Sequence, residues 1–176
     1  MTKEEQRANI RNAIYASKHD RKTYYQIRRA FGLTFDACPI STALSICNIF
    51  NKNVIGYVAS AEDRNIELLV TGLCYTVEDF NSQTRDLSTV RFEVLLQRLY
   101  RQASDTGKNE IKKFLDKRLD TNGYFSKTFA YIAKKALKYK NPNERIDYAQ
   151  LLDDLSNWNK RTTRVFWAKR IAYYEE

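Results

Sequence analysis

The sequence contains few of the residues that shape tight turns: 5 glycines and 2 prolines occur among its 176 residues. A sheet-rich chain of this length needs such residues in its hairpins, whereas a helical chain does not. Leu, Ala, Lys, Arg and Gln, which favour helices, are plentiful. We therefore expect an all-α fold of two small packed helical bundles, with about eight or nine helices. The expected subdomains are residues 1–87 and a basic C-terminal part, residues 88–176.

Long apolar segments and an export signal are also missing. The most apolar stretch, Ile66 to Val77, has about a dozen residues, whereas a membrane span needs roughly 20. The first residues, MTKEEQRAN, are charged and no apolar region follows them, which is unlike a secretory signal. The three cysteines lack a CxxC spacing, which is typical of a reduced compartment. These features predict a cytoplasmic protein that has no membrane partner.

Catalytic and metal-binding motifs are scarce. The single histidine, His19, cannot build a multi-histidine metal site. No Gly-rich phosphate loop, GxSxG or GxGxxG motif occurs. Asp147, Asp153 and Asp154 could hold a metal ion for nuclease chemistry, but they fall on the polar face of an amphipathic pattern. We expect a binding protein without catalytic activity, metal or cofactor, and keep a metal-dependent nuclease as the less favoured alternative.

Positive charge is abundant and unevenly distributed. The formal net charge is +9. Residues 1–87 contain 11 Lys or Arg against 10 Asp or Glu, and residues 88–176 contain 19 against 11. A basic half indicates a polyanionic partner. Nucleic acid and the acidic surface of another protein both fit, so a helical adaptor that docks on an acidic protein stays open as an alternative.

Hydrophobic periodicity and capping residues predict the helices. We expect Ser41 or Thr42 to cap the third helix, Ser60 with Asp63 to cap a buried central helix, and Ser88 to cap the first helix of the basic half. Segment 51–60 is a short strand or a connector, and 79–87 is a polar joint. The expected helices span 3–18, 22–32, 42–50, 62–78, 88–103, 108–119, 124–139, 147–158 and 159–174.

The stretch Ile146 to Tyr174 predicts two helices that meet at a basic corner, formed by Lys160, Arg161 and Arg164. Asp147 is suited to cap the first helix, and Phe166, Trp167, Ile171 and Tyr174 form the apolar face of the second. Cations in a first helical turn oppose the helix dipole and cost roughly 0.3–1 kcal/mol each. The basic corner is therefore either a solvated face or an anion site. The charge of the basic half and the lack of a catalytic motif favour the anion site.

Tyrosine is frequent, with 12 residues, and several tyrosines flank basic residues. Aromatic rings among cations can stack on the bases of a single strand. At helical spacing, however, packing in the core or at its rim is the favoured interpretation for most of them. The tyrosines concerned are Tyr24, Tyr25, Tyr100, Tyr124, Tyr131, Tyr139 and Tyr173.

Three stretches, in order and at similar spacing, resemble the CasB family, the small subunit of the type I-E CRISPR surveillance complex Cascade. The first is QIRRA, residues 26–30, and the second is STVRFEVLLQRL, residues 88–99. The third is IDYAQLLDDLSNW followed by NKRTTRVFWAKRIAYY, residues 146–174. Together with length and helix order, the likeness covers most of the chain.

The resemblance implies an all-helical, non-enzymatic protein that sits as a homodimer among other Cascade subunits in antiviral defence. Such a protein binds guide RNA and target DNA, supports their duplex and the displaced strand, and so stabilises the R-loop. The family's basic positions fall on Arg28, Arg29, Arg91, Lys134, Lys135, Lys160 and Arg161, and Arg64 lies within a residue of another such position. Arg98 and Arg101, on the flank of Arg91, and Arg164 of the basic corner complete the set of candidate nucleic-acid-binding residues.

Overall fold

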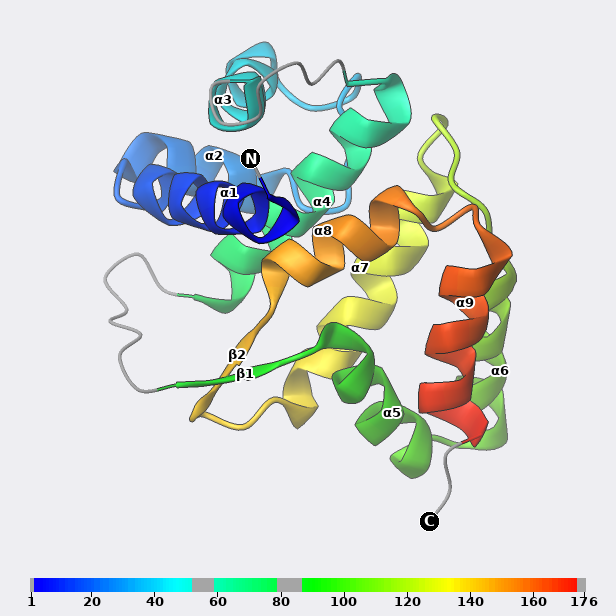
Figure 1. Cartoon of the computed structure of the whole chain (residues 1–176). Helices are drawn as coiled ribbons and strands as arrows, with labels where there is room; N and C mark the ends of the chain where they lie inside the picture. Colours follow the sequence, from blue (N-terminus) through cyan, green and yellow to red (C-terminus); the bar gives the residue numbers. More distant parts are fainter. Residues whose placement is uncertain (1, 52–58, 79–86, 174–176) are drawn as a thin grey trace.

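The computed structural model describes residues 2–51, 59–78 and 87–173, and within them the chain folds into nine α-helices and one pair of short strands (Figure 1). The all-α expectation is confirmed. The elements are α1 (Lys3–Lys18), α2 (Arg21–Arg29), α3 (Ile40–Asn51), α4 (Ala61–Val77), β1 (Ser88–Val90), α5 (Phe92–Gln102), α6 (Asp105–Asp116), α7 (Tyr124–Ala136), the 3-10 turn η1 (Leu137–Tyr139), β2 (Glu144–Ile146), α8 (Tyr148–Ser156), α9 (Arg161–Ala168) and the π-helical segment η2 (Lys169–Tyr173).

Helix α4 lies at the centre of the molecule. Its N-terminus carries the expected capping box, in which the side chains of Ser60 and Asp63 each accept a hydrogen bond from the other residue's backbone N–H. All residues from Asn65 to Tyr75 are buried, because α2, α3, α7 and α8 surround the helix. The sequence prediction of a central, buried helix is therefore confirmed.

Six large aromatic side chains fill the core between α5, α6, α7, α8 and α9. Trp158 and Trp167 are fully buried, and their ring centroids lie 4.9 Å apart in an edge-to-face arrangement. The indole of Trp158 also donates a 2.7 Å hydrogen bond to the carbonyl of Lys117. Both tryptophans therefore fix the turn between α8 and α9. The other members of the cluster are Phe92, Phe114, Phe125 and Phe129.

One continuous hydrophobic cluster runs through both halves of the sequence. Helix α8, although it comes late in the chain, packs against α1 and α4, and α7 also contacts α4 (Figure 1). Helices α5, α6 and α9 lie on the other side of α7 and α8. No helix among the described residues is long and apolar enough to span a membrane.

The segment from Ser88 to Val90 differs from its prediction, because it is a strand and not the start of a helix. Strand β1 pairs with β2 in parallel, with Ser88 opposite Glu144 and Val90 opposite Ile146. The ladder continues into a 2.9 Å hydrogen bond from the N–H of Asp147 to the carbonyl of Val90. Each strand thus leads directly into a helix, β1 into α5 and β2 into α8.

Helix ends also differ from their predictions. Helix α3 starts at Ile40, so Ser41 and Thr42 lie inside it. Helix α6 starts three residues earlier than expected, because the hydroxyl of Ser104 accepts a hydrogen bond from Gly107 N–H. Most of segments 51–60 and 79–87, as well as Tyr174, lie outside the described residues.

The apolar face predicted for the last helix is only partly buried. Trp167 and Ile171 are buried, but 44% of Phe166 is exposed. Two guanidinium groups contact the ring of Phe166: its centroid lies 5.1 Å from Cζ of Arg91 and 5.4 Å from Cζ of Arg170. The cations cover the ring in place of an apolar neighbour.

Candidate nucleic-acid interface

Helix α7 starts at a backbone turn that only glycine adopts easily. Gly123 has a φ of 101°, and the carboxylate of Asp120 accepts hydrogen bonds from Gly123 N–H and Phe125 N–H at 3.1 and 3.0 Å. These contacts direct Phe125, Phe129 and the apolar residues that follow into the core. The opposite side of the helix is exposed. The α7 face, as we call it, consists of Tyr124, Lys127, Tyr131, Lys134 and Lys138, at steps of three and four.

The charged residues of the α7 face are all cations. Residues 124–139 contain four lysines and no Asp or Glu. The fourth lysine, Lys135, flanks the face, with its ammonium 4.2 Å from the ring centroid of Tyr131 and 3.3 Å from the carboxylate of Glu110. Hydrogen bonding to Tyr131, with further support from Glu110, raises the pKa of Lys135. Lys135 therefore keeps its charge.

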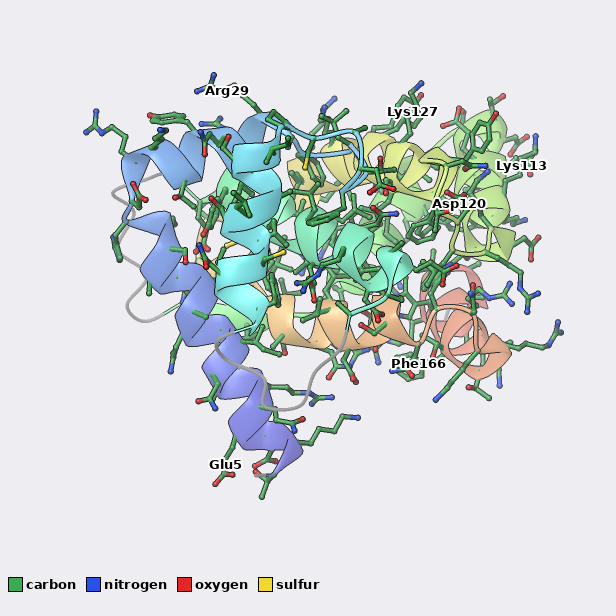
Figure 2. The ribbon with its side chains drawn as sticks, turned by 90° about the horizontal axis from the view of Figure 1, so that it is seen from above. Glu5, Arg29, Lys113, Asp120, Lys127 and Phe166 are labelled. Atoms are coloured by element: carbon green, nitrogen blue, oxygen red, sulfur yellow. The ribbon has the colours of Figure 1, made fainter. Side chains whose placement is uncertain are left out.

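Two arginines from α2 extend this surface. Arg28 and Arg29 are exposed in the last turn of α2, and Gly32, with a φ of 96°, turns the chain towards α7. A Cβ atom on Gly32 would lie 3.0 Å from the Cβ of Ala130, so the two segments are in close contact. The ammonium of Lys134 lies 5.9 Å from the ring of Phe31. Arg29 and Lys127 lie along the same edge of the molecule in Figure 2. We call the α7 face together with Arg28 and Arg29 the α2–α7 surface.

Arg98 has a structural partner. Its guanidinium donates two hydrogen bonds to the carboxylate of Glu144, at 2.7 and 2.9 Å, and a third to the carbonyl of Tyr139. This bidentate pair ties α5 to β2. Arg98 lowers the pKa of Glu144 to about 2, because its hydrogen bonds favour the charged carboxylate.

Arg91 and Arg64 are also engaged by carboxylates. Arg91 pairs with the buried Glu93, and donates a 2.8 Å hydrogen bond to Asp154. Arg64 pairs with the buried Glu67 at 2.9 Å. A buried carboxylate needs such a partner, so Arg64 and Arg91 hold the fold together and have fewer donors left for a phosphate.

The basic corner is on a different part of the surface. Lys160 and Arg161 are exposed at the start of α9, but Arg164 donates hydrogen bonds to the carbonyls of Trp158 at 3.1 Å and Asp116 at 3.5 Å. Arg161 and Arg164 line a groove of about 460 Å³ along α9. Phe166, on α9, lies towards the edge of the molecule opposite Arg29 and Lys127 (Figure 2). The eleven predicted cations therefore do not form one surface.

The remaining predicted cation, Arg101, is exposed in the last turn of α5. Among the described residues, no ion pair involves the cations of the α2–α7 surface, Arg101, Lys160 or Arg161. The nucleic-acid-binding residues predicted from the sequence did not include Lys127 and Lys138. The alternation of Tyr124, Lys127, Tyr131, Lys134 and Lys138 with the apolar residues between them is the signal that could have found both.

The predicted tyrosines differ in exposure. Tyr24 is buried and Tyr100 and Tyr139 are partly buried, in agreement with packing, and Tyr25 is 40% exposed with its ring 5.0 Å from that of Tyr24. The side chain of Tyr173 lies outside the described part of the chain. Tyr124 and Tyr131, however, are 66% and 51% exposed. These two rings point outwards with the lysines of α7, and neither belongs to the hydrophobic cluster.

The three carboxylates of the nuclease alternative each have a structural partner. Asp147 caps α8 by accepting a hydrogen bond from Gln150 N–H. Asp153 pairs with Arg7 at 2.9 Å, and Asp154 accepts hydrogen bonds from Arg91 and from the indole of Trp167. In the part of the chain that the structure describes, no group of three or more His, Cys, Asp or Glu residues could hold a metal ion.

Comparisons with protein-family models, with curated proteins and with solved structures gave no match for this chain. The geometry of the α2–α7 surface and the sequence pattern therefore carry the functional argument.

Proposed function

We propose that the chain is a nucleic-acid-binding, non-catalytic small subunit of a Cascade-type CRISPR surveillance complex. The observation that carries the proposal is the α2–α7 surface. It presents five exposed cations: Arg28 and Arg29 at the end of α2, and Lys127, Lys134 and Lys138 on α7 and η1. The turn after α2 contacts α7 through Gly32 and Ala130, and residues 124–139 contain no carboxylate. Cations on rigid helices are suited to bind a phosphate backbone, whatever its sequence.

Backbone contacts of this kind have a clear use in R-loop formation. The guide RNA–target DNA duplex is about as stable as the DNA duplex that it replaces, so protein contacts to phosphates can tip the balance. A subunit for this role needs positive charge on a stable scaffold and no base-reading element. The resemblance of residues 26–30, 88–99 and 146–174 to the CasB family supports the same assignment.

A subunit of a complex also needs surfaces for other proteins. Helix α3 exposes Ile40 and Leu44, which are 79% and 59% accessible, and Leu33 is 42% accessible. Ile40 and Leu44 are four residues apart and lie on one helix face. Exposed apolar side chains in such an arrangement are typical of protein contacts. This face fits a contact with a second copy or with another Cascade subunit.

Co-purification tests the proposal. The tagged chain is expressed together with Cascade subunits and a CRISPR array from the same genome. We expect the chain to elute with the other subunits and with guide RNA, and to raise the retention of target DNA relative to a complex without it. Elution as a free protein, with target DNA held equally well in its absence, would refute the proposal.

The same apolar residues on α3 favour one second candidate, a helical adaptor that docks on an acidic protein. The two functions differ in whether complex formation requires guide RNA. Under the adaptor function, the substitution Ile40→Asp with Leu44→Asp abolishes complex formation, and the complex forms without guide RNA. Under the Cascade function, assembly requires guide RNA.

A further inference from the structure

Two tyrosines on the α7 face lie outside the hydrophobic core. More than half of Tyr124 and of Tyr131 is exposed, and neither ring belongs to the hydrophobic cluster. Each ring is followed by a lysine three residues later, Lys127 and Lys134. The helix therefore carries the same unit twice, Tyr-x-x-Lys, repeated after seven residues.

The spacing of the two units matches a nucleic-acid strand. Seven residues advance an α-helix by about 10.5 Å and return to nearly the same face. Consecutive nucleotides of a stacked strand are about 3.4 Å apart, so the two rings are about three nucleotide steps apart. Each unit offers one ring for a base and one ammonium for a phosphate, and Lys138 lies one further turn along.

We propose that the α7 face binds unpaired bases, with Tyr124 and Tyr131 as stacking platforms and with Lys127, Lys134 and Lys138 as phosphate contacts. The ligand is single-stranded nucleic acid. This inference rests on the nucleic-acid binding in the proposed function, and it adds that bases, and not only phosphates, contribute to affinity.

Contacts around Tyr131 prepare its ring for stacking. The ammonium of Lys135 lies 4.2 Å from the ring centroid and is itself held by Glu110. A cation against one face restricts the ring and does not compete with a base for the other face. Base–aromatic stacking is sequence-tolerant, because every base has a π-face.

A duplex cannot use these tyrosines in the same way, because its base faces are covered by their neighbours. Double-stranded nucleic acid can contact only the cations of the α7 face. An acidic protein could also pair with the lysines, but it has no bases to stack. The contribution of bases therefore separates the three classes of ligand.

The test compares three fluorescent probes of equal length, about 16 nucleotides, by fluorescence anisotropy with the full chain. The probes are oligo-dT, an abasic strand with the same phosphates, and a duplex. Oligo-dT should bind more tightly than the abasic strand, by about 5- to 150-fold per stacked tyrosine. The variant Tyr124→Ala with Tyr131→Ala should bind oligo-dT about as weakly as the abasic strand, and its affinity for the other two probes should not change.

A second variant keeps the aromatic platforms. Tyr124→Trp with Tyr131→Trp should retain the preference for oligo-dT, and the fluorescence of the new indoles should be quenched on binding. Equal affinity of the wild type for oligo-dT and for the abasic strand would overturn the stacking inference but leave phosphate binding intact. Equal loss of all three probes in the alanine variant would also overturn it. Failure to bind any probe, with binding only to an acidic polypeptide, would refute both the inference and the proposed function.

Discussion

Replacing Lys127 and Lys134 together by glutamine should reduce the salt dependence of nucleic-acid binding. The size of the reduction follows from the number of cations on the α2–α7 surface. Each cation that neutralises a phosphate of a single strand contributes about 0.7 to the slope of log K against log salt. Arg28, Arg29, Lys127, Lys134 and Lys138 are exposed and make no ion pair among the described residues. Five such contacts give a slope of about −3.5, and removing two gives about −2.1.

These slopes correspond to measurable changes in affinity. Between about 50 and 200 mM salt, the wild type should lose about 100-fold in affinity for a single strand, and the variant about 20-fold. Fluorescence anisotropy titrations at four or more salt concentrations give both slopes. Circular dichroism should show no change in helix content or melting temperature, because both lysine side chains are exposed.

The matched control removes two charges from another helix. Lys3→Gln with Arg11→Gln changes the net charge by the same amount. Both side chains are exposed on α1, where Lys3 also pairs with Asp153 at 3.4 Å. Its slope should equal that of the wild type. If the control and the α7 variant reduced the slope equally, binding would depend on net charge alone and the α2–α7 surface would have no special role.

Three further outcomes are expected. Arg98→Ala should lower the free energy of unfolding by roughly 2 kcal/mol in urea unfolding, since it removes a charge-assisted pair. This loss of stability should shrink as the pH falls from about 4.5 towards 2. The reason is that Glu144 has a lowered pKa of about 2, so the stabilisation by its pair with Arg98 is lost on protonation. A loss of stability that did not change over this pH range would contradict that cause. Gly123→Ala should lower the free energy of unfolding by about 1–2 kcal/mol, because a residue with a side chain is strained at a φ of 101°. An unchanged melting temperature would show that the alanine is not strained there. Lys160→Gln with Arg161→Gln should change the affinity for a probe of about eight nucleotides by less than twofold, because both residues lie at the start of α9 and outside the α2–α7 surface. A larger loss would show that the phosphates bind at the basic corner.

The helices were predictable from local signals. The capping box of Ser60 and Asp63 and the periodic apolar residues of α4 and α8 depend only on near neighbours in the sequence. Strand β1 was not predictable in this way, because its three residues pair with a partner strand that starts at Glu144. Nothing near Ser88 in the sequence distinguishes such a strand from a helix N-terminus.

The cations were harder to sort. Arg28 and Lys134 are exposed as expected, whereas Arg91 and Arg98 are held by carboxylates that are distant in sequence, Asp154 and Glu144. A single sequence shows where positive charge is frequent, but not which cations pair across the fold. Residues 124–139 are the exception, since they contain no carboxylate of their own.

Lysine footprinting of the chain bound to single-stranded DNA tests most directly whether nucleic acid lies on the α2–α7 surface. The chain is acetylated with and without DNA, and modified lysines are quantified by mass spectrometry. Lys127, Lys134 and Lys138 should be protected in the complex, and Lys3, on α1, should react equally in both samples. Unchanged reactivity of the three α7 lysines under conditions in which the DNA is bound would contradict the account.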